Sequence, residues 1–531
     1  MKRIEKRLET SPSPPSCRCM FQCEKHGTTI WNEILAGLTT FLILSFSYYQ
    51  SSVLLINSLT ISGEYIPSIM AVMLLYTAIL SIFAGFYLKR PVLYSISTGM
   101  TVFLTAGIFS SYNMSIASGF GILLVEGIVF LLLIFTGLPR WIVKQTPMWI
   151  QKGSPAILGS FLVLFAMLST GLISLESDAT FVSQTLRNPT ILLFFFGFLL
   201  SLTLYYIKTK NSFLIAILIT IFFGFILSKN SDSTTFRVSW LILTGYIAAW
   251  LMLFSILFDK NVKNALEKSL WILIGALFIG ILLYSNPHSI ILKPQQWFGN
   301  QGIFKIPSFS VFPIFVGSSV STVGIFFSEI SVFWAPFLSL LTFHFFLYVC
   351  MFYSIQSFVS YDDDTHSQQT LFSKNMITEG IASLCAGGSS LASLHSSTAS
   401  PIHVAVGAKT GASSVAYGFM SLFSLFTIPL LSYVLLPITL APFLLSVGII
   451  LIVHTLQSFE TLALSTLVPL ISTIVIAIVT MDIVQSLLVG IILYAVVASY
   501  QRKQVSFGFW MVVIVFFIFE FFRIVIPYFS I

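Results

Sequence analysis

The stretch Gly387–Gly411, GGSSLASLHSSTASPIHVAVGAKTG, lies among long apolar runs that are typical of membrane-spanning helices. It holds six serines, four glycines, two histidines and one proline, which is too polar for a helix that faces lipid. Irregular backbone at membrane depth is tolerated only where it lines a cavity or is buried in protein. The stretch therefore predicts an interrupted segment inside a helical bundle.

The composition of the whole chain sets the class of protein. Hydrophobic residues make up 56% of 531 residues, charged residues only 8%, and the mean hydropathy is +0.96. The continuous apolar runs are roughly 15–28 residues long, which suits helices that cross a hydrocarbon core of about 30 Å. They exclude the ten-residue alternation of a membrane barrel. The sequence predicts an all-α polytopic membrane protein with roughly fourteen to seventeen crossings.

Lysine and arginine recur mainly in alternate loops, whereas the loops between them, such as Ser58–Tyr65 and Ser110–Ser118, carry neither. Basic loops stay on the cytoplasmic side during insertion. We therefore expect a multi-pass protein of the plasma or inner membrane with a cytoplasmic N-terminus. The basic segments are Met1–Lys25, Lys89-Arg90, Arg140–Lys152, Lys208–Lys210, Lys260–Lys268 and Arg502-Lys503.

A second interrupted stretch, Tyr94–Thr105 (YSISTGMTVFLT), places Ser, Thr and Gly where a spanning helix is expected. Two such segments at matching places in two halves are typical of inverted-repeat transporters, in which half-helices and free backbone groups meet the substrate near the midplane. The alternative is a polar re-entrant loop that is packed for structural reasons alone.

Three motifs carry a resemblance to a known family. Phe21–Phe41 (FQCEKHGTTIWNEILAGLTTF) resembles the opening signature of the xanthine/uracil permease (nucleobase–cation symporter) family, closest to its hypoxanthine/guanine/adenine purine permease branch. Val125–Leu138 (VEGIVFLLLIFTGL) resembles that branch's fourth crossing, and Lys409-Thr410-Gly411 lies where the branch has G-G-R-T-G. In the same register, Glu379 falls on an acidic residue that opens the ninth helix.

The resemblance implies a fold of two inverted repeats of seven helices, with a core domain that moves against a gate domain in elevator fashion. It also implies that the third and tenth segments are each a short extended stretch followed by a half-helix. It implies a symporter of purine-like nucleobases (hypoxanthine, guanine, adenine, xanthine or uracil), with H⁺ as a possible coupling ion and a homodimer as a common assembly. The expected parts are a cytoplasmic tail 1–29, core 30–138 and 307–436, gate 139–228 and 437–531, and an insertion 229–306 that contains an extra apolar hairpin, 240–284.

The same register places neutral residues where the family has two carboxylates. The acidic position of the eighth crossing falls on or near Tyr353, and that of the tenth segment falls on Ala399, or on His395 or Ser396 after a small slip. Hydroxyl, amide and imidazole groups can still donate to and accept from a purine. The expected substrate contacts are Gly99, Thr101, Tyr353, Gln356, His395, Ser396, Thr398, Ala399 and Ser400.

Two ionisable residues are the candidates for proton coupling. Glu126 lies in the middle of a span, where ionisable groups are costly and usually functional, although it could equally form a structural hydrogen bond. His395 belongs to the interrupted stretch, and histidine titrates near physiological pH.

Several alternatives stay open at this point. Replacement of the two family carboxylates by neutral residues would favour the binding of an anionic substrate. The main alternative is therefore an anion transporter of the sulfate-permease type on the same fold. A divergent family member without proton coupling, and a scaffold without transport, are also compatible with the sequence. An enzyme is not expected, because no nucleophile–base pair has usable spacing. Cys17, Cys19 and Cys23 with His26 match no closed zinc pattern, so we expect no metal. The net charge of +7 is a topology signal rather than a nucleic-acid footprint, so we expect no nucleic-acid partner, and no cofactor is expected.

Overall fold

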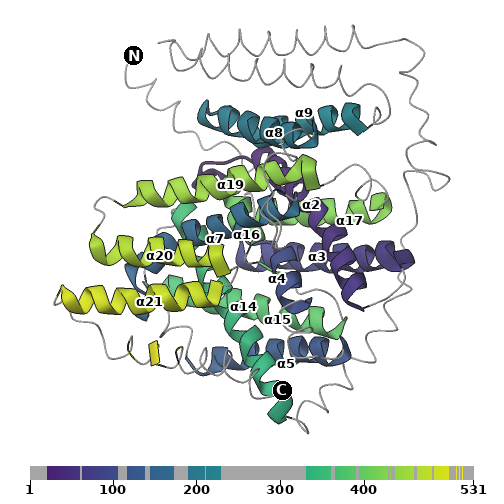
Figure 1. Cartoon of the computed structure of the whole chain (residues 1–531). Coiled ribbons are helices and arrows are strands. Elements are labelled where there is room, and N and C mark those ends of the chain that lie inside the picture. The colour runs from purple at the N-terminus through teal and green to yellow at the C-terminus, as the bar shows by residue number, and fades with distance from the viewer. Residues whose placement is uncertain are drawn as a thin grey trace, which may run out of the picture.

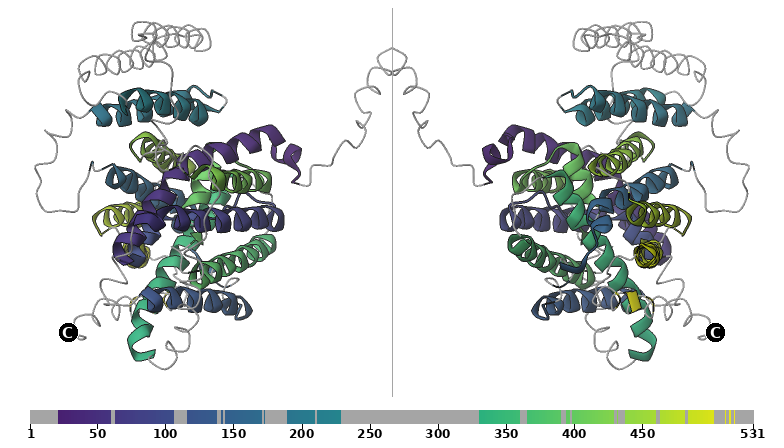
Figure 2. Two further views of the ribbon diagram at one scale, coloured as in Figure 1. Left: turned by 90° about the vertical axis from the view of Figure 1, so that its right-hand side faces the viewer. Right: turned by 90° about the vertical axis from the view of Figure 1, so that its left-hand side faces the viewer.

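The computed structural model describes residues 21–105, 116–172, 189–228, 330–428 and 437–501, with short gaps inside these ranges and isolated positions up to 517. Most of the long helices run side by side in roughly the same direction (Figure 1). Among the described elements, α8 and α9 lie at one end of the bundle and α5 at the opposite end (Figure 2).

The first half of the chain forms two short 3₁₀ turns, η1 and η2, and a series of helices interrupted by one short strand. In order, the elements are η1 Cys23–His26, α2 Ile30–Leu59, η2 Gly63–Tyr65, α3 Ile66–Leu88, β1 Ser95–Ile96, α4 Thr98–Val102, α5 Ile116–Phe135, α7 Met148–Ser169, α8 Pro189–Tyr206 and α9 Ser212–Ser228.

The second half of the chain is also a series of helices interrupted by one short strand. Its elements are α14 Ile330–Phe358, α15 Thr365–Gly388, β2 Leu394–His395, α16 Ala399–Val406, α17 Gly411–Ser424, η6 Leu425–Thr427, α19 Pro437–Ser458, α20 Leu464–Thr480 and α21 Ile483–Tyr500.

Five of the described helices are long and apolar enough to cross a membrane by length and composition, which confirms the prediction of a mostly helical, multi-pass membrane protein. They cover Ile30–Ser58, Gly63–Leu88, Met148–Ser169, Phe333–Phe358 and Leu440–Ser458.

Most predicted spans agree with the helices to within a few residues, but two helices begin much earlier than the apolar runs. α7 begins at Met148 rather than at Ile157, and α15 begins at Thr365 rather than at Met376. Hydropathy marks where a helix is apolar, whereas helical hydrogen bonding continues through polar turns as well. The predicted hairpin 240–284 and the insertion 229–306 lie outside the described residues.

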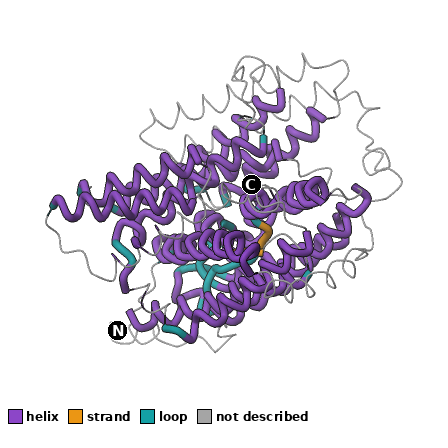
Figure 3. The backbone as a smooth tube through the Cα atoms, turned by 60° about the horizontal axis from the view of Figure 1, so that its bottom comes forward, coloured by secondary structure: helices purple, strands orange, loops and turns teal. Residues whose placement is uncertain are grey.

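Both interrupted stretches form a short strand followed by a short helix, as the family resemblance implies. β1 and β2 pair in antiparallel fashion, with Ser95 opposite His395 and Ile96 opposite Leu394. All four residues are buried, and the strand pair lies among the helices (Figure 3). Because buried backbone N–H and C=O groups need partners, each extended segment supplies what the other requires.

The elements around each strand follow the same order in both halves of the chain. A long helix, a strand, a short helix and a long helix succeed one another in α3–β1–α4–α5 and again in α15–β2–α16–α17. The outer helices pack crosswise between the halves, since α3 lies along α17 and α5 lies along α15. The first contact is very close: a Cβ placed on Gly411 would lie 2.1 Å from the carbonyl oxygen of Gly85, so only glycine fits there.

The carboxylate of Glu33, which is fully buried on α2, stabilises the start of α17. Its oxygens accept hydrogen bonds from the backbone N–H of Lys409 at 3.2 Å and from the backbone N–H and hydroxyl of Thr410 at 3.0 Å each. Thr410 is the N-cap of α17, and its hydroxyl oxygen accepts from the backbone N–H of Ala412 at 3.3 Å. Glu33 therefore holds the N-cap residue and places a negative charge near the positive end of the helix dipole. The opening motif and the Lys409–Gly411 motif therefore meet in space.

Candidate functional site

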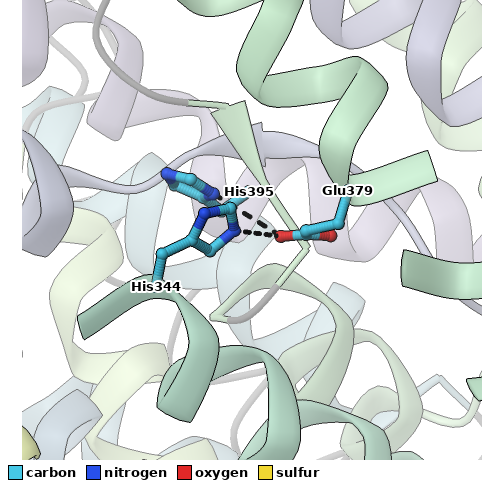
Figure 4. Close-up of side chains that lie close together, drawn as sticks. All are labelled: His344, Glu379 and His395. Carbon is cyan, nitrogen blue, oxygen red and sulfur yellow. Dashed lines mark hydrogen bonds and ion pairs between the residues drawn. The ribbon is translucent and has the colours of Figure 1, made fainter. Parts of the chain in front are cut away.

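Four buried ionisable side chains converge beside the strand pair. They are Glu126 from α5, His344 from α14, Glu379 from α15 and His395 from β2, and each has an exposed fraction of 0%. Figure 4 shows His344, Glu379 and His395 turned toward one another. The packing of α5 along α15 places the two carboxylates in the same region, and α14 brings its histidine between them. We call these four residues the buried cluster.

His344 bridges the two carboxylates of the buried cluster. Its Nδ1 lies 2.9 Å from Glu126 Oε1, and its Nε2 lies 2.9 Å from Glu379 Oε1. The ring of Phe130 stacks on the imidazole with ring centroids 4.5 Å apart. Stacking and two hydrogen bonds fix the orientation of the ring, so His344 is a linker between α5 and α15.

Glu379 also connects the buried cluster to the interrupted segment. Its Oε1 accepts a hydrogen bond from the backbone N–H of Ser396 at 3.2 Å, and its Oε2 accepts one from the Ser396 hydroxyl at 2.6 Å. Hydrogen bonds to an ionised carboxylate are stronger than neutral ones. The turn that follows β2 is therefore held directly by a charged group on α15.

His395 is the least satisfied member of the buried cluster. Its Nδ1 lies 3.5 Å from Glu379 Oε1, beyond a good hydrogen bond, and neither ring nitrogen has a hydrogen-bond partner among the described residues. The ring packs edge-on against His344 with centroids 3.8 Å apart. An unpartnered buried polar group costs about 1–3 kcal/mol, so this imidazole is placed as a binding group for a ligand would be.

The two predicted residues of the first interrupted segment lie on α4. Thr101 is buried, and its hydroxyl donates to the carbonyl oxygen of Ser97 at 3.0 Å and lies 3.4 Å from the Ser51 hydroxyl. Gly99 faces α7, since a Cβ placed there would lie 2.9 Å from the ring of Phe161. A side chain at position 99 would press on α7.

The predicted residues of the second interrupted segment divide by role. Ser396 belongs to the buried cluster through Glu379. The Ser400 hydroxyl accepts from the backbone N–H of Leu93 at 3.1 Å and donates to its carbonyl oxygen at 3.2 Å, so it ties α16 to the chain before β1. Ala399 is buried, and Thr398 is half-buried at the start of α16.

Tyr353 and Gln356 lie away from the buried cluster along α14. They follow His344 by nine and twelve residues, which corresponds to about 13 Å and 18 Å of helix. The residue of the eighth crossing that contacts Glu126 and Glu379 is His344 instead. His403, which also flanks the interrupted segment, has both ring nitrogens occupied, by Thr40 and Ser413 at 2.8 Å each.

Sequence reasoning named Glu126 and His395 but missed His344 and Glu379, the other two members of the buried cluster. The family register placed Glu379 on an acidic residue of the ninth helix, but the substrate contacts were sought only in the third, eighth and tenth segments, whereas the two carboxylates come from α5 and α15. One signal was available: His344 and Glu379, like Glu126, are ionisable residues within otherwise apolar or buried helices, and such residues are functional by default.

The donor atoms of His344, Glu379 and His395 lie within 4.8 Å of one another, a spacing that a metal ion could bridge. Both ring nitrogens of His344, however, already face carboxylate oxygens at hydrogen-bond distance. Shared protons therefore account for the contacts of this residue.

A cavity of about 780 Å³ lies between α2, the turn joining α8 to α9, the end of α16, and α19. Its lining combines aromatic, cationic and small side chains, and includes Thr39, Tyr205, Lys208, Val404, Lys409 and His454. The cavity reaches the C-terminal turn of α16, the short helix that follows β2.

No family model matches the chain. The chain is 24% identical over 210 residues to the adenine permease AdeQ of Escherichia coli K12, covering 39% of this chain and 46% of that protein. It is 26% identical over 168 residues to the guanine/hypoxanthine permease GhxP of Escherichia coli O157:H7, covering 30% of this chain and 36% of that protein. The chain thus spans less than half the length of these curated relatives.

Among solved structures, the chain is similar to the transmembrane domain of the cyanobacterial bicarbonate transporter BicA. The TM-score is 0.40 at 13% identity, over 87% of this chain and 97% of that one. The resemblance noted in the sequence motifs is confirmed by the curated proteins: the chain is a multi-pass membrane protein whose distant homologues are adenine and guanine/hypoxanthine permeases.

Proposed function

We propose that this protein is a secondary transporter of purine-like nucleobases, and that the substrate lies where β1 and β2 meet. The observation that carries the proposal is the position of His395, a buried imidazole on one of two paired extended segments inside the bundle, whose ring nitrogens accept or donate no hydrogen bond among the described residues and whose Nδ1 lies 3.5 Å from Glu379. The distant relatives named as adenine and guanine/hypoxanthine permeases support the same class of substrate.

The proposed fold is an inverted repeat with a core and a gate. Its support is the repeated order of elements around β1 and β2, together with the crosswise packing of α3 on α17 and α5 on α15. The core would hold α2–α5 and α14–α17, and the gate would hold α7–α9 and α19–α21. The large cavity lies along this proposed boundary, as alternating access by an elevator motion requires.

The chemistry of the buried cluster suits a neutral heterocycle better than an anion. A purine presents both N–H donors and ring-nitrogen acceptors, and the Glu379 carboxylate, the Ser396 hydroxyl and the His395 imidazole can match both kinds. Two carboxylates close to the site would repel sulfate, and this repulsion is strong where water is excluded. The anion-transporter alternative is therefore the less favoured reading.

The remaining predicted substrate contacts have different roles in this proposal. Gly99, Thr101, Thr398 and Ala399 line the two interrupted segments and belong to the proposed cradle. Tyr353 and Gln356 would contact substrate only on its path through the protein, because they lie farther along α14. The basic loops favour a cytoplasmic N-terminus, and a homodimer stays a prediction.

The experiment that tests this function is uptake into proteoliposomes of radiolabelled hypoxanthine, guanine, adenine, uracil and sulfate. We expect saturable uptake of at least one purine, and a loss of about tenfold or more in His395→Ala, since a lost buried hydrogen bond has that size. The matched control is His366→Ala, because His366 is exposed at the start of α15. Accumulation of sulfate alone, or full purine uptake by His395→Ala, would refute the proposal.

A further inference from the structure

We propose that Glu126, His344 and Glu379 form a proton carrier that loads one proton on Glu126 in each transport cycle. The inference rests on the proposed function and deepens it, because it assigns the coupling ion to residues outside the interrupted segments. The proposed carrier does not include Tyr353 or Ala399, the residues that the family register places at its two acidic positions.

The contacts of His344 fix the number of shared protons. A neutral imidazole has one N–H and one bare nitrogen, yet both ring nitrogens lie 2.9 Å from a carboxylate oxygen. Two favourable contacts therefore require either an imidazolium between two carboxylates, or a neutral ring with one carboxyl group protonated. In both forms the three residues hold two protons and carry a net charge of −1.

No cationic side chain among the described residues pairs with this net negative charge. Within the described part of the chain, no lysine or arginine forms an ion pair with the buried cluster. The nearby tyrosines donate elsewhere: Tyr94 donates to Thr378 at 2.6 Å, and Tyr348 donates to the carbonyl oxygen of Phe372 at 2.6 Å. His403 on α16 binds Thr40 and Ser413, and His395 is the remaining titratable neighbour.

Within Glu126, His344 and Glu379, one atom without a described hydrogen-bond partner is available to receive a further proton. Glu126 Oε2 is buried and has no hydrogen-bond partner among the described residues, whereas Oε1 of the same carboxylate contacts His344. A proton added at Oε2 leaves an imidazolium paired with the Glu379 carboxylate and a neutral carboxyl group. The three residues then carry no net charge.

This change in charge provides a physical basis for coupling. A buried net charge is costly to carry through the hydrocarbon region, so the core would move readily only when Glu126 is protonated. Glu379 holds the turn at Ser396 through two hydrogen bonds, which places the same network in contact with the substrate segment. One proton would enter from the outer solution, cross with a neutral base, and leave to the cytoplasm, so each cycle moves one positive charge.

The test compares net uptake with exchange in proteoliposomes. For the wild type, we expect an inward proton gradient to stimulate purine uptake about fivefold or more, as coupling energies of this kind allow. In Glu126→Gln this stimulation should disappear, while counterflow exchange of labelled for unlabelled purine persists, because exchange needs no net proton movement. Glu64→Gln, an exposed glutamate in η2, is the matched control and should keep the stimulation.

A second measurement does not depend on transport. Infrared difference spectra of the purified protein between acidic and neutral pH should show a carboxylic-acid C=O band that Glu126→Gln removes and Glu64→Gln keeps. The inference is overturned if the band survives in Glu126→Gln, or if this variant keeps the gradient stimulation. Purine uptake without any gradient effect in the wild type would overturn the carrier and leave the proposed function intact, whereas absence of all purine uptake would overturn the function itself.

Discussion

Ser95 and His395 lie directly opposite each other in the antiparallel pair of β1 and β2. Their segments are about 300 residues apart in the chain, and both are followed within a few residues by a short helix. The pairing explains how two irregular stretches can lie inside an apolar bundle, because each satisfies backbone groups of the other. It also places the imidazole of His395, which has no hydrogen-bond partner among the described residues, where the two segments meet.

The first prediction concerns the stability that His344 supplies. His344→Ala would leave two carboxylates buried without their shared partner, and breaking a buried pair typically costs about 3–5 kcal/mol. Thermal unfolding in detergent should show a large decrease in Tm. Combining His344→Ala with Glu126→Gln and Glu379→Gln should recover much of the loss, since the repulsion is removed. Equal Tm values for the single and triple variants would argue against paired charges.

The second prediction concerns the start of α17. Glu33→Ala removes the acceptor that holds Lys409 and Thr410, the N-cap residue of α17, and a weakened N-cap costs about 0.5–2 kcal/mol. We expect faster proteolysis and a lower Tm, with a smaller effect for Glu33→Gln. Glu24→Ala changes an exposed glutamate of η1 and should leave both quantities unaltered. A Tm for Glu33→Ala equal to that of the wild type would contradict the capping role.

The third prediction concerns the contact between α3 and α17. Gly411→Ala places a methyl group 2.1 Å from the Gly85 carbonyl oxygen, and overpacking of this kind costs about 1–3 kcal/mol. Gly388→Ala is the matched control, because a Cβ there meets no atom within 4 Å. Unfolding measurements should separate the two variants. Similar stabilities for both would mean that the two helices are farther apart than described.

The fourth prediction tests whether the substrate lies near Ser396 of the tenth segment or near Tyr353 of the eighth crossing. Ser396→Ala removes the hydroxyl that donates to Glu379, and a hydrogen bond to a charged group contributes about 1.5–3 kcal/mol. Purine uptake should fall about tenfold or more, as that free energy implies. Tyr353→Phe, which changes a residue about 13 Å along α14 from His344, should alter uptake much less. The reverse order of effects would place the substrate at the Tyr353 level instead.

The helices and the two interrupted segments could be predicted from the sequence, because apolar runs and clusters of Ser and Gly are local features. The runs beginning at Ile30 and Ile66 become α2 and α3 with nearly the same bounds. The polar stretches around Gly99 and Thr398 form the two strand–helix segments. In both cases the residues that decide the conformation are neighbours in the chain.

The buried cluster could be predicted only in part, because its members are distant in the chain. Glu126 and His395 were each recognised as unusual ionisable residues, but nothing local shows that His344 joins Glu126 to Glu379. That relationship depends on the packing of α5 along α15 and on the rotation of α14. Likewise, the motif containing Glu33 gave no sign that its carboxylate binds the Lys409–Gly411 motif.

Equilibrium binding of radiolabelled hypoxanthine and guanine to the purified protein tests the central claim most directly. We predict saturable binding of at least one of these purines, weakened about tenfold or more by His395→Ala and unchanged by His366→Ala. Undiminished binding by His395→Ala, or absence of binding for both purines to the intact wild-type protein, would contradict a purine site at the junction of β1 and β2.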